Sequence, residues 1–129
     1  MRTILIALVA TVGIPTIAAA QPPAKVGTCA TSKIVAIGTR FDDKLRRPSK
    51  DVEDNGTTVA LANGTYGVDY QFVEAVYESK VGDRVLVCLV SVPKDCPKGD
   101  DRGKVYTTTN LRTQRSWTLG DSQHMCGGA

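Results

Sequence analysis

Apolar and polar residues alternate in short runs along most of this chain, a pattern typical of β-strands. The runs cover Lys33–Phe41, Arg84–Val92, Lys104–Asn110 and Ser116–Leu119, and stretches rich in glycine, proline, asparagine and charged residues separate them. Both faces of the Arg84–Val92 run are apolar, so we expect this strand to lie centrally in its sheet or to be covered. The spacing predicts five to six short strands.

The segment TTVALANGTYGVDYQF (57–72) carries the clearest turn signal. Asn63-Gly64 is a dipeptide that two-residue type I′ turns prefer, because both positions need a positive φ. Such a turn places large side chains on one face of the ribbon, in the cross-strand pairs Leu61–Tyr66, Val59–Val68 and Thr57–Tyr70. Small and polar residues then fall on the other face, and we predict a β-hairpin in this register.

One stretch, Gln71–Lys80, has helical spacing. Phe72 lies four residues before Val76, and Val73 lies four residues before Tyr77. We therefore expect two to three turns of helix over 71–80. With the short strands, this predicts an all-β fold, a small barrel or sandwich with one short helix, and an α+β roll is the alternative.

Two stretches between the predicted strands are loops. Asp42–Gly56 mixes basic and acidic residues with little apolar content, and we interpret it as a solvated loop. A binding loop is the alternative, because long loops on small domains often carry function. Pro93–Gly103 is dense in proline, glycine and aspartate, and its GDDRG sequence favours a tight turn in which aspartate and arginine are hydrogen-bonded.

Residues 1–20 have the pattern of a secretory signal peptide. Arg2 precedes an apolar run from Ile4 to Ile17, and the small residues Ala18–Ala20 provide a cleavage site. The run is shorter than the roughly 20 residues that a membrane-spanning helix needs. We therefore divide the chain into a signal peptide (1–20), a short lead (21–28) and a single domain (29–129), located in the periplasm or outside the cell.

The charge balance argues against a polyanionic partner. Sixteen basic and thirteen acidic residues give a formal charge of +3, and removal of the signal takes away Arg2. Such a weak excess does not favour nucleic acid or acidic membranes. After the signal, no stretch is long and apolar enough for a membrane span.

Four cysteines remain in the predicted mature chain, and an even number in a small exported domain indicates two disulfides. Three pairings are possible. We predict Cys88–Cys96, which closes a short loop, and Cys29–Cys126, which joins the start and the end of the domain. Zinc coordination is not favoured, because no C-x-x-C pair occurs.

The tail DSQHMCGGA contains the chain's one histidine, His124, near Asp121, Ser122 and Cys126. These residue types occur in nucleophilic sites. A triad, however, needs a base within reach of the hydroxyl and a carboxylate on the far side of the imidazole, which one short segment rarely provides. A Cys126–His124 pair would need a free thiolate. We therefore favour a turn that is followed by a disulfide-bonded terminus.

A weaker alternative site combines Asp100 and Asp101 with His124, if the loop folds back on the tail. Hard oxygen ligands suit calcium, but KGDDRGK lacks the alternating spacing of a calcium loop. We predict no metal and no cofactor.

Arginine and tryptophan around one predicted hairpin loop form the best candidate for a binding patch, because both are enriched in interface hot spots. The patch consists of Arg112, Arg115 and Trp117, and Arg102 joins it if the strands place the neighbouring loop there. For Trp117 itself we favour a core position over an exposed one, because the chain has only seven aromatic residues and the core needs its one tryptophan.

The lack of a convincing catalytic set, together with export and two disulfides, favours a small non-catalytic binding module for a protein or an envelope component. An inhibitor is one form of such a module. The first alternative is a small hydrolase or metal-dependent enzyme that uses His124 with Asp100 and Asp101, or with Cys126. The second is a structural component of an envelope complex.

Overall fold

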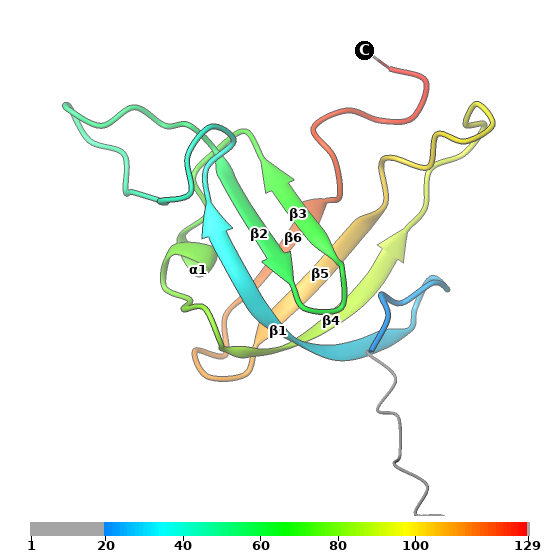
Figure 1. Cartoon of the computed structure of the whole chain (residues 1–129), viewed down its shortest axis with the longest axis horizontal. Helices are drawn as coiled ribbons and strands as arrows, with labels where there is room; N and C mark the ends of the chain where they lie inside the picture. The colour runs from blue at the N-terminus through cyan, green and yellow to red at the C-terminus, as the bar shows by residue number, and fades with distance from the viewer. Residues whose placement is uncertain (1–19, 129) are drawn as a thin grey trace, which may run out of the picture.

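Residues 20–128, which a computed structural model describes, form a closed antiparallel β-barrel with six strands and one short helix (Figure 1). Residues 1–19 and 129 lie outside this part, and the predicted signal peptide falls almost wholly on them. The elements are β1 (Cys29–Gly38), β2 (Thr57–Leu61), β3 (Tyr66–Asp69), α1 (Glu74–Tyr77), β4 (Arg84–Ser91), β5 (Val105–Asn110) and β6 (Ser116–Gly120). The all-β prediction is confirmed in the form of a barrel.

Within the described chain, the barrel consists of two three-stranded meanders, β1–β2–β3 and β4–β5–β6. β1 joins them, because its first half pairs with β4 and its second half pairs with β2. A bulge between Ile34 and Ala36 lies near the point where β1 changes partner. On the other side, β3 and β6 close the barrel through the pair Val68–Gly120.

The core is lined by alternate residues of the strands and by one face of α1. Its buried members are Ile34, Val59, Leu61, Ala75, Val76, Val85, Val87, Leu89, Tyr106, Trp117 and Leu119. Gly67 of β3 makes room for Leu119, since a Cβ at Gly67 would lie 3.0 Å from Leu119 Cδ1. The core therefore uses two of the chain's seven aromatic residues, Tyr106 and Trp117.

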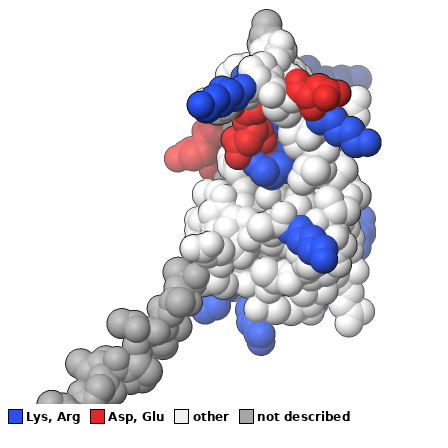
Figure 2. Space-filling view, turned by 90° about the vertical axis from the view of Figure 1, so that its right-hand side faces the viewer, with Lys and Arg blue, Asp and Glu red and all other residues white. Residues whose placement is uncertain are grey.

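The side of the barrel formed by β4 and β5 carries few charges on its outer face. Leu86 and Val90 of β4 are partly exposed there, and the hydroxyls of Thr107 and Thr118 are 2.7 Å apart across β5 and β6. Figure 2 shows this side, with most of its acidic residues near the end from which the loop after β4 projects. β4 lies between β1 and β5, as predicted for a central strand, but its outer face is only partly covered.

The hairpin between β2 and β3 forms, but its predicted register is wrong by one residue. Ala60 pairs with Tyr66, and the Leu61 N–H donates to the Thr65 carbonyl at 2.9 Å, which leaves residues 62–64 as the loop. Gly64 has a φ of +88°, whereas the Asn63 side chain accepts a hydrogen bond from the Thr65 N–H at 3.1 Å. A three-residue loop needs one left-handed position instead of two. The slip turns the Tyr66 ring to the outside.

The helix is shorter than predicted because the backbone N–H groups of residues 71–73 are hydrogen-bonded to side chains of the barrel and its loops. The N–H of Gln71 donates to the Asp69 carboxylate at 2.8 Å, and the N–H of Phe72 donates to Asp54 at 3.0 Å. The N–H of Val73 donates to Thr57 Oγ1 at 2.9 Å. These bonds keep residues 71–73 out of the helix, which begins at Glu74. No helix within residues 20–128 has the length and apolar character needed to cross a membrane.

The disulfides are Cys29–Cys88 and Cys96–Cys126, so the predicted pairings Cys29–Cys126 and Cys88–Cys96 are wrong. Cys29 and Cys88 face each other on β1 and β4, with Cα atoms 4.0 Å apart. The tail runs back beside the loop after β4, where the Cys126 N–H donates to the Arg102 carbonyl at 2.9 Å. Strand register and tail docking, rather than chain distance, thus bring the cysteines together. Two disulfides are consistent with an oxidising, exported location.

Candidate functional site

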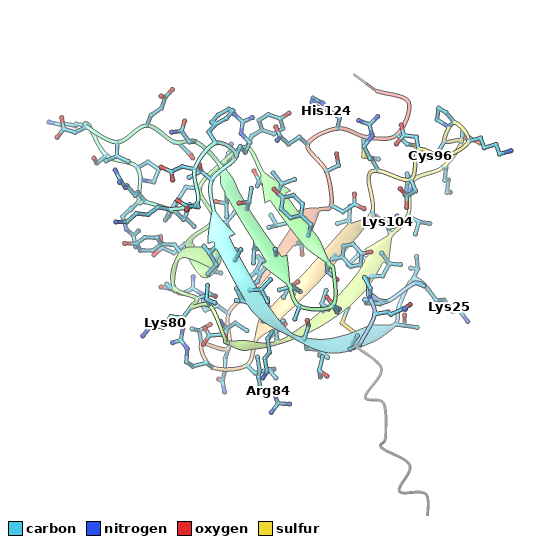
Figure 3. All side chains as sticks on the ribbon, viewed as in Figure 1. Lys25, Lys80, Arg84, Cys96, Lys104 and His124 are labelled. Carbon is cyan, nitrogen blue, oxygen red and sulfur yellow. A yellow bond between two sulfur atoms is a disulfide. The ribbon has the colours of Figure 1, made fainter. Side chains whose placement is uncertain are left out.

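The described part of the C-terminal tail is docked rather than arranged around a reacting group. Cys126 is disulfide-bonded, and Ser122 Oγ accepts a hydrogen bond from the His124 N–H at 3.3 Å. Asp121 Oδ1 accepts from the Gly103 N–H at 2.7 Å, which fastens the tail to the loop after β4. Figure 3 shows His124 at the same end of the barrel as this loop, and Arg84 at the opposite end. Cys126 therefore offers no free thiolate to His124.

Asp100 and Asp101 are paired with basic neighbours. Arg102 donates to both Asp100 oxygens at 2.8 Å, which confirms the predicted aspartate–arginine turn. Together with a hydrogen bond from the Gly127 N–H, the Arg102 guanidinium holds the pKa of Asp100 well below its usual range. Lys104 likewise lowers the pKa of Asp101. No group of three or more histidine, cysteine or acidic side chains in residues 20–128 is placed to hold a metal ion.

The four residues of the predicted arginine–tryptophan patch do not share a surface. Trp117 is 6% exposed and belongs to the core. Arg112, in the β5–β6 turn, donates twice to the Asp83 carboxylate at 2.7 Å, and Arg115 lies 3.3 Å from Glu78. Arg102 precedes β5 and is therefore at the other end of this strand. Arg112 and Arg115 thus brace the fold around α1, and Trp117 fills the core.

The structure instead brings aromatic and arginine side chains together beside the loop between β1 and β2. We name this set the aromatic–arginine surface, and its members are Arg40, Phe41, Arg47, Tyr70, Phe72 and Tyr77. Phe41 is 74% exposed, Tyr70 51% and Tyr77 41%. Four of the chain's seven aromatic residues therefore lie outside the core in this one region.

One half of this surface is built on Arg40. The Arg40 Cζ lies 4.7 Å from the centre of the Phe41 ring and 4.3 Å from the centre of the Tyr70 ring. Such cation–π contacts stabilise exposed sites by about 0.5–1 kcal/mol each. Gln123 of the tail accepts from Arg40 Nη1 at 3.5 Å, and its carbonyl accepts from the Tyr70 hydroxyl at 3.4 Å. The docked tail thus completes this half.

The other half is built on Arg47, which the loop carries across to α1. The Arg47 Cζ lies 5.5 Å from the Phe72 ring centre and 5.1 Å from the Tyr77 ring centre, and the two rings are 5.3 Å apart. Both Glu74 oxygens accept hydrogen bonds from Arg47, and Glu74 raises the pKa of that guanidinium. The charge of Arg47 is therefore matched within the protein.

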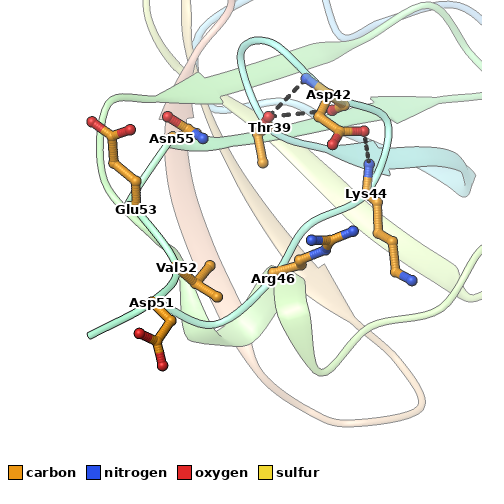
Figure 4. A pocket seen from close by; sticks show the side chains of 8 residues that line it. All are labelled: Thr39, Asp42, Lys44, Arg46, Asp51, Val52, Glu53 and Asn55. Carbon is orange, nitrogen blue, oxygen red and sulfur yellow. Dashed lines mark hydrogen bonds between the residues drawn. The ribbon is translucent and has the colours of Figure 1, made fainter. Parts of the chain in front are cut away.

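Two hollows flank the turn at residues 39–43. The first, of about 190 Å³, is shown in Figure 4 and is lined by Thr39, Asp42, Lys44, Arg46, Asp51, Val52, Glu53 and Asn55. Its wall carries both signs of charge, and Asp42 Oδ1 accepts a hydrogen bond from the Lys44 N–H at 3.2 Å. The second is shallower, about 490 Å³, and lies beside Arg40 and Phe41 against the end of β1.

Local pattern does not predict the aromatic–arginine surface, because Phe41 falls at the end of a predicted strand, and Phe72 and Tyr77 fall on the faces of a longer predicted helix. Arg40 and Tyr70 are thirty residues apart, so their contact depends on the closed fold. The alternative interpretation of Asp42–Gly56 as a binding loop is the sequence signal closest to this region. No protein-family model matches the chain, and no curated protein or solved structure matches it significantly.

Proposed function

We propose that this protein is a small exported binding module, periplasmic or extracellular, that recognises a protein or an envelope component through the aromatic–arginine surface and catalyses no reaction. The two disulfides support the exported location, because such bonds persist in oxidising compartments. The pairing of Cys126 with Cys96 supports a tail that serves to complete a surface.

The observation that carries the proposal is the exposure of aromatic rings in a domain with few of them. A chain of this size is marginal on its core alone, and each buried aromatic ring would add to that core. Phe41 and Tyr70 nevertheless remain largely exposed, next to an arginine. Clustered aromatic and arginine side chains are the residues that dominate binding energy in protein interfaces. An exposed cluster of this kind is typical of a recognition surface.

The test is capture from the exported fraction of the source cell by the immobilised protein and by two variants. Phe41→Ala combined with Tyr70→Ala removes both rings from Arg40, and the proposal predicts loss of the captured partner. Tyr66→Ala is the matched control, because Tyr66 is an exposed tyrosine of β3 outside the aromatic–arginine surface, and it keeps the partner.

Equal capture by the double variant and the wild type would contradict the proposed surface. A hydrolytic activity that disappears in His124→Ala, with an unchanged melting temperature, would contradict the non-catalytic assignment.

A further inference from the structure

Arg40 has few of its hydrogen bonds satisfied by the protein. Four other arginines form ion pairs with carboxylates: Arg47, Arg102, Arg112 and Arg115. Arg40 is only partly exposed, yet no carboxylate of residues 20–128 lies within ion-pair distance of it. Its Nε is buried and finds no acceptor in the described chain, and its Nη1 bond to Gln123 is long, at 3.5 Å. A guanidinium has five N–H donors, so the Nη groups of Arg40 retain donors for an external acceptor, whereas the buried Nε–H does not reach the surface.

The position of Arg40 is fixed before any ligand arrives. Two rings hold the guanidinium, and the side-chain stem lies against Gly56, where an added Cβ would be 3.1 Å from both Arg40 Cγ and Arg40 Cδ. The Arg40 N–H donates to the Asn55 carbonyl at 3.1 Å, which fixes the backbone as well. A side chain that is already ordered loses little conformational entropy on binding. Arg40 is therefore preorganised as a receptor.

The lining of the hollow beside Arg40 indicates which kind of ligand group lies next to the hydrogen-bond acceptor. Its wall includes the apolar side chains of Ala36, Ile37, Phe41 and Val81 at the end of β1. A planar guanidinium fork matches a carboxylate, and an apolar wall matches a hydrocarbon side chain next to it. The expected ligand group is therefore a carboxylate attached to an apolar residue.

The charge and the shape of the hollow further limit which ligands can carry this carboxylate. Asp42 and Asp43 line the same hollow, and their negative charges oppose any anion there. Because this repulsion grows with the charge of the ligand, a singly charged carboxylate is opposed less than a phosphate or any other multiply charged anion. The hollow is also shallow, so it cannot enclose most of a small free ligand, as binding pockets for small molecules do. The end of a longer chain, whose remainder contacts the neighbouring surface, satisfies both conditions.

On this basis, and resting on the proposed function, we propose that Arg40 and the adjoining hollow bind the C-terminal carboxylate of a partner polypeptide that ends in an apolar residue. The carboxylate accepts hydrogen bonds from the Arg40 guanidinium, and the last side chain packs against Phe41 and Val81. The exposed Tyr70 ring contacts the residues that precede the terminus.

The experiment is an NMR titration of the folded, disulfide-bonded protein, labelled with ¹⁵N. Three probes are compared: the peptide acetyl-Ala-Ala-Val with a free carboxylate, the same peptide as its C-terminal amide, and inorganic phosphate. We expect saturable shifts of the Arg40 Nε–H and the Phe41 amide with the free acid. The acid should bind at least about tenfold more tightly than the amide, since hydrogen bonds to an ionised group are about twice as strong as neutral ones.

Two arginine variants locate the effect. Arg40→Gln is expected to abolish the preference for the acid over the amide. Arg84→Gln is the matched control, because Arg84 is an exposed arginine at the opposite end of the barrel, and it keeps the preference (Figure 3). The contrast between acid and amide on the unmodified protein needs no variant, so it stands even if Arg40→Gln unfolds.

Equal affinity for acid and amide would overturn the proposal, and so would tighter binding of phosphate than of the acid. The two proposals fail separately. If capture depends on Phe41 and Tyr70 but the acid does not bind, the aromatic–arginine surface stands as the binding site and the carboxylate ligand is ruled out. If the acid binds but capture is unaffected by the rings, the carboxylate site remains and the proposed function is wrong.

Discussion

At Gly56 the backbone has a φ of +76°, and an added Cβ would lie 2.4 Å from the Asp69 carbonyl oxygen. The same Cβ would press on the stem of Arg40. This single residue therefore sets both the return of the loop into β2 and the placement of the guanidinium. Glycine is the residue that accepts a left-handed φ without a steric penalty, and here it also leaves the space that Arg40 occupies.

Gly56→Ala is expected to destabilise the protein more than Gly82→Ala. Both positions have a positive φ, so both variants carry the left-handed penalty of about 1–2 kcal/mol. Gly82, with a φ of +94°, has nothing within 4 Å of the added Cβ, so the excess loss at Gly56 measures the collision with Asp69 and Arg40. Urea unfolding followed by Trp117 fluorescence gives both values. Equal losses of unfolding free energy in the two variants would show that a side chain at residue 56 does not collide with Asp69 or Arg40.

At the scale of elements, one polar network ties the end of α1 to the β5–β6 hairpin. Asn110 is fully buried, and its amide donates to Ser79 Oγ and to the Asp83 carboxylate, each at 2.8 Å. Arg112 binds the same carboxylate from the hairpin side, and it holds the pKa of Asp83 well below its usual range. Arg112, which the sequence pattern places in a possible binding patch, therefore has a structural role in the fold.

This network predicts a stability loss in acid. Asp83 has a lowered pKa in the folded state, so its contribution is present above the unfolded value of about 3.9 and is lost as the pH falls toward the folded pKa. We expect Asp83→Asn to lower the free energy of unfolding at pH 7 by about 1–2 kcal/mol, a value discounted for the half-exposed Arg112. We also expect the variant to lose less stability than the wild type between pH 7 and pH 3.

The matched control is Asp51→Asn. Asp51 is an exposed loop residue whose carboxylate accepts no hydrogen bond from residues 20–128, and its replacement leaves both the stability at pH 7 and its acid dependence unchanged. Urea unfolding at the two pH values measures the effect. If the wild type and Asp83→Asn lose the same free energy of unfolding between pH 7 and pH 3, Asp83 is not the group that makes the protein sensitive to acid.

At the scale of the whole molecule, the two disulfides act on different parts of the barrel. Cys29–Cys88 crosslinks β1 to β4, and so joins the two meanders. Cys96–Cys126 holds the tail, which carries Gln123 to Arg40 and Tyr70. The first bond therefore supports the framework and the second supports the aromatic–arginine surface.

Removing either disulfide is expected to lower the free energy of unfolding. The loss should be larger for Cys29–Cys88, because this bond closes the longer loop. The bridges span 59 and 30 residues, for which the chain-entropy model gives about 4.2 and about 3.6 kcal/mol respectively. Cys29→Ser with Cys88→Ser and Cys96→Ser with Cys126→Ser are compared with the wild type by urea unfolding. A larger loss from the tail bond would show that tail docking contributes more than loop closure does.

Alternation predicts the strands well, because it depends on neighbours two residues apart, and Arg84–Val92 differs from β4 by one residue. The hairpin register fails at Asn63 because two-residue and three-residue loops share the same dipeptide signal. The disulfide pairing and the Arg40–Tyr70 contact fail because both depend on which strands become neighbours, and local pattern does not encode that.

The closure of the barrel at Val68 and Gly120 has a kinetic consequence. Separating this pair leaves a continuous sheet in the order β3-β2-β1-β4-β5-β6 with its other ladders and both disulfides intact. Val68–Gly120 is the one strand pair between β3 and β6 in residues 20–128, so local opening at this seam breaks less strand pairing than opening between any other two neighbouring strands. Amide protons of β3 and β6 that face this seam should exchange with solvent first, and those of β1 and β4 last.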